Sequence, residues 1–369
     1  MSTRIKPSPN TPEKIQIQKL SHVYLRHADP EAFLTFAAAF GFEEEARDDD
    51  AVYLRGYGVD PYCYVVLGKE RAFEGGAWTV KSREDLEKAM RLPGATRRDL
   101  VGVPGAGELV SVSSPGGTKM HLLWGQQTRA APSTEPSAQV VSVGPANHPF
   151  MKERKGAFQR FKPGPAMIHK LGHYGYISSA FDADLAFYLD NFNLTPSDIL
   201  YDPSQPALDI LAFLHVDLGT EFSDHHSLFI QRAPTPPSTP PPPSPPPSPP
   251  SLSSSPATDQ TPNSHPHPHP PPAIMHHTSF EVSDFDTQLL GHQWLATQPG
   301  PHAPVWGVGR HVLGSQIFDY WRDPSGFKIE HYADGDEVNC ETPVARLPAG
   351  PDTLSVWGPP LPVDFGEAD

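Results

Sequence analysis

Apolar residues follow strand-like and helical spacings in four similar stretches of the chain. In the first stretch, residues 19–25 alternate between apolar and polar as a β-strand does, and residues 29–40 have helical spacing behind an acidic first turn. Residues 51–55 and 61–67 are again typical of strands. Comparable series of elements begin at residues 76, 170 and 274. Each stretch is therefore expected to form a β-α-β-β-β unit.

Short internal repeats relate these four units. Residues 115–121 align with residues 324–330, and the strand openings at His22, His173 and His277 align with one another. Such self-similarity is typical of a fold built from copies of one supersecondary unit. We therefore expect an α+β fold of four βαβββ modules in two paired domains, with curled mixed sheets.

The composition between the units predicts the domain boundaries. The segment 234–272 contains 19 of the 46 prolines, and such a tract buries too little apolar surface to order itself. The expected organisation is a disordered arm at 1–16, an N-terminal domain at 17–125, a connection at 126–165, a C-terminal domain at 166–338 with a disordered insert at 234–272, and a Pro-rich tail at 339–369.

A hairpin near the end of the fourth unit predicts a side-chain pair. Asp323-Pro-Ser-Gly326 is typical of a type I turn followed by glycine in the left-handed conformation. With Asp323 opposite Phe327, Tyr320 falls opposite Glu330, and their Cβ atoms lie on one face about 5 Å apart. A phenol and a carboxylate are thus expected to share a pocket.

Composition argues against several classes of partner and location. The formal net charge of −15 disfavours binding to nucleic acid or to an anionic membrane. Two cysteines, Cys63 and Cys340, form neither a disulfide framework nor a thiolate zinc site, so a reducing, cytoplasmic location is expected. No apolar run approaches the roughly 20 residues of a membrane span, and the first residues lack the apolar core of a signal peptide.

Two histidines and one glutamate form the candidate metal site. His173 and His277 occupy equivalent positions in the first strands of their units, and Glu330 lies on the last strand of the fourth. If these units curl around a common pocket, two imidazoles and one carboxylate face it. That set, with open positions left over, is the one non-haem Fe(II) uses in oxygen chemistry.

These motifs resemble those of the type I extradiol ring-cleavage dioxygenases, a group of the vicinal oxygen chelate superfamily that includes catechol 2,3-dioxygenase. The resemblance covers about residues 17–338 apart from the Pro-rich insert. It rests on Leu-Gly-His173, His-His277-x-x-Phe-Glu-Val, Gly-Arg-His311 and Tyr320-x-x-Asp-Pro-x-Gly-x-x-x-Glu330.

The resemblance implies an Fe(II)-dependent enzyme that cleaves a catecholic ring beside its diol with O2, to a muconic semialdehyde-type product. By it, His173, His277 and Glu330 match the metal ligands, and Mn(II) is the alternative ion. The catalytic residues implied are the acid/base His226, with His225 as the alternative, the substrate-contacting Tyr320, and His311, which supports the site in some members.

Two features depart from the family's pattern. The insert at 234–272 separates the acid/base strand from the second ligand strand, and its removal leaves a ligand separation that is ordinary for the family. Gly175 stands where some catecholate-specific members carry a polar side chain, a departure that bears on the substrate and not on the metal.

The N-terminal domain is expected to be non-catalytic. His22 and His121 stand at ligand-equivalent places, but the second unit opens with Gly-Ala77-Trp where a histidine is needed. Ser111 stands in the place of the tyrosine. Two ligands do not make this site.

Other functions are kept as alternatives. A glyoxalase-like isomerase has no need of His226 and Tyr320, and a binding protein without chemistry has no need of an intact metal set. The identity of the substrate is left open, and a homo-oligomer is expected. The Pro-rich insert is a candidate ligand for a domain that recognises polyproline. For its His265, His267 and His269 we expect a solvated loop and not a metal site.

Overall fold

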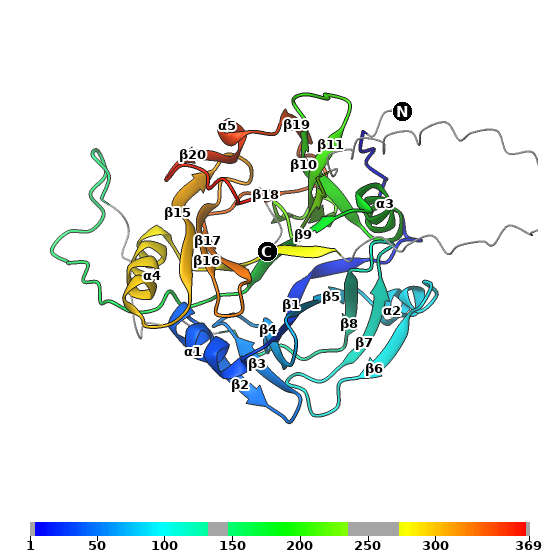
Figure 1. Ribbon diagram of the computed structural model, residues 1–369, viewed down its shortest axis with the longest axis horizontal. Helices are drawn as coiled ribbons and strands as arrows, with labels where there is room; N and C mark the ends of the chain where they lie inside the picture. Colours follow the sequence, from blue (N-terminus) through cyan, green and yellow to red (C-terminus); the bar gives the residue numbers. More distant parts are fainter. Residues whose placement is uncertain (1–3, 132–146, 235–272, 367–369) are drawn as a thin grey trace, which may run out of the picture.

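The computed structural model describes residues 4–131, 147–234 and 273–366, which form two curled sheets (Figure 1). The first half of the chain contributes an eight-stranded sheet and the second half a ten-stranded one, with a further two-stranded sheet. A strand, a helix and three main sheet strands follow one another four times along the chain. This order confirms the expected α+β fold of four βαβββ modules. Within the described ranges, no helix is long and apolar enough to cross a membrane.

The first two modules share the eight-stranded sheet. Its strand order is β2-β3-β4-β1-β5-β8-β7-β6, and the antiparallel pair β1–β5 joins the two modules. The elements are β1 (Ile17–His27), α1 (Pro30–Phe40), β2 (Glu43–Arg47), β3 (Ala51–Arg55), β4 (Tyr64–Gly68), β5 (Ala72–Val80), α2 (Arg83–Ala89), β6 (Thr96–Asp99), β7 (Glu108–Ser113) and β8 (Lys119–Trp124).

Local sequence signals set the ends of α1. The Asp29 carboxylate accepts a hydrogen bond from the backbone N–H of Ala32 at 3.0 Å, which caps the first turn. The helix ends at Gly41, whose φ of 113° is in the left-handed region. A Cβ atom there would also lie 1.9 Å from the carbonyl oxygen of Ala166, so only glycine fits.

The third and fourth modules share the ten-stranded sheet. Its order is β19-β10-β11-β13-β9-β14-β17-β16-β15-β20, and the antiparallel pair β9–β14 joins the two modules. The elements are β9 (Leu171–Ser178), α3 (Phe181–Asn191), β10 (Leu194–Tyr201), β11 (Asp209–Val216), β12 (Ser223–Asp224), β13 (Leu228–Arg232), β14 (Ile274–Glu281), α4 (Phe285–Thr297), β15 (Ala303–His311), β16 (Ile317–Arg322), β17 (Lys328–Ala333) and β18 (Glu337–Val338).

The C-terminal tail extends this second sheet at both edges. It contains β19 (Ala345–Pro348), α5 (Pro351–Leu354) and β20 (Ser355–Trp357). Strand β19 pairs in parallel with β10, and β20 pairs antiparallel with β15. The tail thereby gives both edge strands a hydrogen-bonded partner and brings its own side chains over one face of the sheet.

The main hydrophobic core contains residues from both halves of the chain. The Phe40 ring stacks on the His331 ring with centroids 3.6 Å apart, and Phe42 meets Phe280 edge-on at 4.8 Å. His331 Nε2 also donates to the carbonyl oxygen of Phe40 at 2.7 Å. The two domains therefore share one core rather than folding around separate ones.

The N-terminal arm is ordered over its described residues, so the expectation of a disordered arm is wrong for 4–16. The Ile5 backbone N–H donates to Asp209 Oδ2 at 2.7 Å, and the Lys14 ammonium donates to the Leu189 carbonyl at 2.6 Å. Ile15 is buried and its N–H donates to Asn191 at 2.8 Å. The polar composition misled because these partners lie far away in the sequence.

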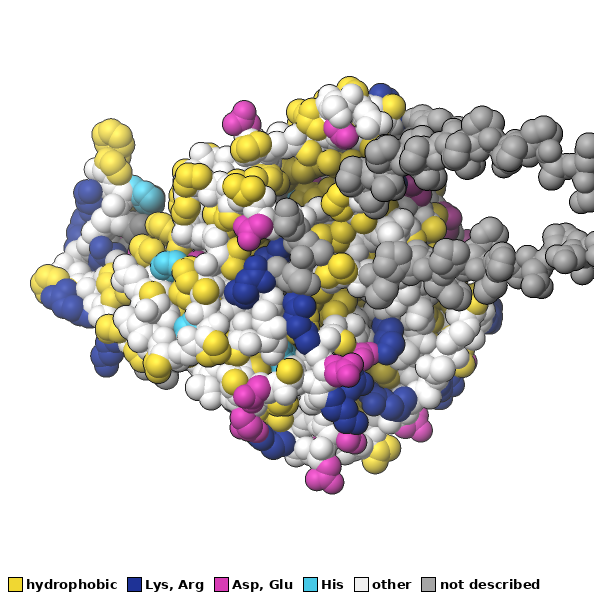
Figure 2. Space-filling view, viewed as in Figure 1, with side chains coloured by type: hydrophobic (Ala, Val, Ile, Leu, Met, Phe, Trp, Pro, Cys, Tyr) yellow, Lys and Arg dark blue, Asp and Glu magenta, His cyan; other side chains and the backbone are white. Residues whose placement is uncertain are grey.

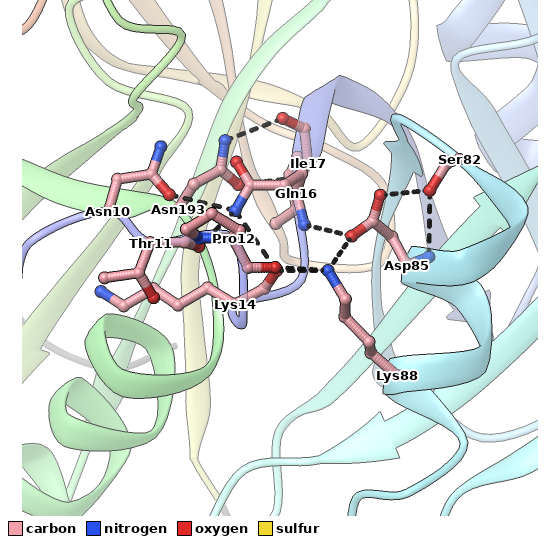
Figure 3. A network of polar contacts seen from close by, with 10 residues as sticks. All are labelled: Asn10, Thr11, Pro12, Lys14, Gln16, Ile17, Ser82, Asp85, Lys88 and Asn193. Atoms are coloured by element: carbon pink, nitrogen blue, oxygen red, sulfur yellow. Dashed lines mark hydrogen bonds and ion pairs between the residues drawn. The ribbon is translucent and has the colours of Figure 1, made fainter.

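A polar network ties the arm to both halves (Figure 3). The Gln16 N–H donates to Asp85 Oδ1 at 3.1 Å, and the Ile17 N–H donates to Asn193 Oδ1 at 2.6 Å. The Lys88 ammonium reaches both the Lys14 carbonyl and Asp85. Because Asp85 and Lys88 lie on α2 of the first domain and Asn193 lies directly before β10 of the second, the arm bridges the two domains.

We expect Asp85→Ala to lower the free energy of unfolding by about 2 kcal/mol. The carboxylate is buried and accepts hydrogen bonds from Ser82, Lys88 and Gln16, so its removal leaves donors unpaired, at about 1–3 kcal/mol for each buried group. Urea denaturation measures the change. Glu84→Ala, at an exposed neighbouring position, is the control and should stay within about 0.5 kcal/mol of the parent. Equal stability of the two variants would contradict a structural role for the network.

Candidate metal centre and its pocket

The predicted hairpin register is confirmed. Tyr320 pairs with Glu330 across β16 and β17, and the Asp323 N–H donates to the Phe327 carbonyl at 2.9 Å. Gly326 has a φ of 88°, as the turn requires. Tyr320 and Glu330 are both buried on the same face of the sheet.

Three neighbouring strands bring the predicted ligand residues together. His173 is on β9, His277 on β14 and Glu330 on β17, and these strands are adjacent in the sheet. The two imidazole Nε2 atoms lie 3.1 Å apart, and each lies 3.3 Å from Glu330 Oε2. Across the part of the chain that the structure describes, this is the one group of three or more His, Cys, Asp or Glu side chains with ligand atoms all within 4.8 Å of one another.

The donor set fits a divalent cation. The side chain of Glu330 is fully buried, and neither of its carboxylate oxygens has a well-formed hydrogen bond to a described residue. Burial lowers the pKa of His277 to about 4, so this imidazole is neutral near pH 7 and presents a lone pair. Two converging imidazole nitrogens and a carboxylate in a dry site repel one another unless a cation lies between them.

The electrostatics of Glu330 favour its ionised form. Burial acts to raise the pKa of this carboxyl, but the imidazoles of His173 and His277, whose Nε2 atoms each lie 3.3 Å from Glu330 Oε2, outweigh burial and bring the pKa below its ordinary value. An ionised carboxylate is the form that binds a metal ion.

His276 orients the second ligand histidine. Its Nδ1 lies 2.8 Å from Nδ1 of His277, within hydrogen-bond distance. A metal-binding histidine commonly engages its second ring nitrogen in this way, which fixes the direction of the first. His277 Nε2 is thus held toward His173 and Glu330. Sequence reasoning used His276 only as part of a motif and did not foresee this contact.

His226 lies against the centre, and His225 lies behind it. The His226 ring is centred 4.1 Å from the His173 ring and lines the pocket. His225 Nδ1 is 3.0 Å from His226 Nδ1, while His225 Nε2 is 2.8 Å from Asp198 Oδ2. Burial lowers the pKa of His226 well below its ordinary value. Asp198 and His225 therefore hold the neutral His226 imidazole from behind, and His226 faces the pocket.

Tyr320 and His311 form a hydrogen-bonded pair beside the centre. His311 Nδ1 is 2.7 Å from the Leu354 carbonyl, which can only accept, so Nδ1 carries the hydrogen. His311 Nε2 then accepts from the Tyr320 hydroxyl at 2.9 Å. Burial raises the pKa of Tyr320 well above its ordinary value, so the phenol stays protonated. The Tyr320 oxygen keeps its lone pairs for a bound ligand.

A cavity of about 560 Å³ connects these groups. Five of the six predicted site residues line it, namely His173, His226, His277, His311 and Tyr320, and Glu330 lies directly behind the imidazoles. The tail closes one side, where Phe365 packs on the Tyr320 ring with centroids 4.8 Å apart. Figure 2 shows hydrophobic side chains gathered on this face around α5 and β20. No sequence signal pointed to Phe365, because its partners lie in distant strands.

The corresponding position in the first half is filled by aromatic rings. Ser111 pairs with His121 across β7 and β8 as Tyr320 pairs with Glu330. The Tyr24 ring is centred 4.9 Å from the His22 ring and 4.9 Å from the His121 ring. With Ala77 in place of a second strand-opening histidine, no metal group forms there among the described residues. The three histidines of the insert, at 265, 267 and 269, for which a solvated loop is expected, lie outside the described residues.

Comparisons with known proteins give a curated relative and several solved structures of similar fold. No family model matches the chain. A curated relative, Metapyrocatechase 2 of Cupriavidus necator, is 27% identical over 240 residues, which covers 61% of this chain and 58% of the relative. The chain thus matches less than two thirds of the length of that relative.

Two solved structures share the fold over nearly the whole chain. Homoprotocatechuate 2,3-dioxygenase from Arthrobacter globiformis matches with a TM-score of 0.69 at 16% identity. The match covers 98% of this chain and 94% of the dioxygenase chain. The Mn(II)-bound glyoxalase from Novosphingobium aromaticivorans has a TM-score of 0.66 at 17% identity and covers 94% of each chain. The expected vicinal oxygen chelate fold is therefore present, and the resemblance to the extradiol dioxygenases is supported.

Proposed function

We propose that this chain is a type I extradiol dioxygenase, which binds Fe(II) and cleaves a catecholic ring with O2. The observation that carries the proposal is the buried His173, His277 and Glu330 group with two further polar groups, His226 and Tyr320, facing the same cavity. The relative and one of the structural neighbours, named as a metapyrocatechase and a dioxygenase, support it.

The three ligand residues would hold a redox-active divalent ion. Such an ion supplies electron transfer between a catecholate and O2, which otherwise react slowly. Because His173 and His277 line the cavity, an ion held by the three residues would be accessible to a substrate there. The ring opens beside the diol, and both oxygen atoms of O2 enter the product.

His226 would act as the general base and acid. Its neutral imidazole faces the cavity, where it takes a proton from a substrate hydroxyl and returns it later in the cycle. His225 and Asp198 hold the ring from behind. The Tyr320 hydroxyl donates its hydrogen bond to His311 Nε2, and its oxygen would accept a hydrogen bond from the substrate hydroxyl. His311 keeps the phenol in that orientation.

Mn(II) is the second candidate ion. A neighbour with the same fold is described as a Mn(II)-bound glyoxalase, and nitrogen and carboxylate ligands suit both metals. The choice between the two ions therefore depends on a direct analysis of bound metal.

Metal analysis with oxygen uptake tests the proposal. Protein purified without oxygen should hold about one equivalent of iron. One molecule of O2 should be consumed for each molecule of catechol cleaved, while a yellow ring-opened product forms. Chelation should abolish uptake, and adding Fe(II) should restore it, with Mn(II) tested in parallel. Protein that binds no metal and consumes no O2 with any catechol would instead favour a binding protein.

A further inference from the structure

We propose that the substrate is a catechol with a neutral, apolar ring substituent of several carbon atoms, and not a catechol that carries a carboxylate. The inference rests on the proposed function and specifies its substrate class. It is drawn from the size, lining and charge of the cavity beside the metal centre.

The cavity is much larger than a bare catechol needs. Its volume is about 560 Å³. An apolar cavity of about 150 Å³ is enough to bind benzene. A diol anchored at the metal centre therefore leaves most of the space to a substituent.

An apolar wall begins at the metal centre. On β11 and β13, Phe213 pairs with Phe229, and both rings line the cavity. The Phe229 ring is centred 4.9 Å from the His277 ring, and the Phe213 ring 4.8 Å from the His226 ring. A ring held at the centre would lie against both phenylalanines.

The backbone is adapted to hold Phe229 in this position. A Cβ atom at Gly175 would lie 2.0 Å from the Phe229 ring, so the absence of a side chain there makes room for the ring. Gly175 and Phe229 are paired across β9 and β13. The position two residues after His173 thus supplies apolar surface instead of a polar contact.

The wall continues away from the centre. Two residues along the same strands, on the same face of the sheet, Leu211 pairs with Gln231. Strand geometry puts this pair about 7 Å farther from the metal centre. Leu200 on β10 pairs with Leu211, and the tail contributes Leu354 and Phe365 from the other side. Gln231 donates one amide N–H to the Gly366 carbonyl at 3.0 Å, so its amide is directed toward the tail. A chain of several carbons would be enclosed by apolar surface.

Away from the metal centre, the described lining of the cavity offers a carboxylate no available cation. Among the described residues that line it, Arg232 is the only lysine or arginine, and its guanidinium makes a two-point pair with Asp182 at 2.6 and 2.7 Å. Its Nε also donates to the Asp209 carbonyl, and the group lies over the Phe181 ring. A substrate carboxylate would have to displace an existing, well-formed pair.

The rim of the cavity adds a negative charge instead. Asp202 lies at the rim, where hydrogen bonds from Ser204 lower its pKa and keep it anionic. A buried carboxylate without a partner is strongly unfavourable, and this anion adds repulsion.

A pair of substrates with nearly the same shape tests the proposal. The isobutyl group of 4-isobutylcatechol matches the carboxymethyl group of 3,4-dihydroxyphenylacetate in its heavy atoms, and the 3-substituted isomers form a second pair. We expect kcat/KM of the iron-loaded enzyme to be at least about 50-fold higher for an isobutylcatechol than for catechol, from burial of its carbons. The carboxylated partner should fall below catechol. Equal or better cleavage of the carboxylated compound would overturn the proposal.

A charge placed in the wall should weaken this preference. Leu211→Arg adds a cation two residues along the strand from Phe213, so the ratio of kcat/KM for the two compounds should shift by more than tenfold toward 3,4-dihydroxyphenylacetate. Val101→Arg adds the same charge at a position of the first domain that is 88% exposed, and its ratio should equal that of the parent. Iron content and urea denaturation check that both variants are folded. An unchanged ratio in Leu211→Arg would contradict the assigned wall.

Calorimetry separates this inference from the proposed function. Binding of the same pair to the metal-free protein is measured without turnover, and the isobutyl compound should bind more tightly by at least tenfold. If no catechol is cleaved by iron-loaded protein but this preference is found, the proposed function fails and the pocket assignment stands. If catechols are cleaved without this preference, the substrate class is wrong and the ring-cleaving function stands.

Discussion

Replacing Glu330 with alanine is expected to abolish both retention of the metal and ring cleavage. The carboxylate is the only anionic member of the group and is fully buried between His173 and His277. Four-ligand zinc sites bind with apparent free energies of about 10–16 kcal/mol, so one ligand is worth roughly 3 kcal/mol, or more than 100-fold in affinity. Metal content after gel filtration and oxygen uptake with a catechol measure the two effects.

The control for this experiment is Glu337→Ala. Glu337 is an exposed carboxylate on β18, outside the centre, and its loss should leave metal content and activity as in the parent. His277→Ala should repeat the result of Glu330→Ala, because it removes a second donor from the same point. A Glu330→Ala protein that is fully active without iron would show that the metal assignment is wrong.

His226→Gln should lower kcat by about 10²–10⁴-fold while the protein still binds its metal. This is the range that a positioned general acid or base contributes. Glutamine keeps the volume and a hydrogen bond toward His225 but cannot take up a proton. Steady-state kinetics and metal content, measured on the same sample, separate loss of the proton acceptor from loss of the centre.

His225→Gln is the matched variant that discriminates between the two adjacent histidines. His225 does not line the cavity and contacts the site through His226, so we expect a smaller loss, of roughly 10–100-fold as for outer partners of a site. A larger loss at His225 than at His226, with metal content intact in both, would transfer the acid/base role to His225.

Several site features were predictable because they depend on short stretches of chain. The turn residues Asp323 and Gly326 set the hairpin register, and strand alternation then puts Tyr320 and Glu330 on one face. The repeat of this turn in the first half likewise predicted that Ser111 faces His121. In each case the interacting residues are separated by ten positions, so local geometry is sufficient.

Other parts could not be predicted from composition. The polar, proline-bearing arm looked disordered, yet Lys14 and Ile15 are buried against residues near 190. The tail was predicted only as Pro-rich, yet Phe365 packs on Tyr320 and His276. Strand β6 (Thr96–Asp99) is short and exposed on every residue, so it carries no alternation to detect. Long-range partners supply the order in the arm and the tail.

The amino-acid sequence is sufficient to propose the modules, the hairpin and the identities of the metal ligands, because turn chemistry, strand alternation and repeat alignment can all be read from short stretches of chain. They are not sufficient to bring His173 and His277, from different modules, to 3.1 Å from each other. That distance depends on β9, β14 and β17 lying side by side in one sheet. The shape and charge of the cavity depend further on β11, β13 and the tail, whose contacts arise only when the chain is packed.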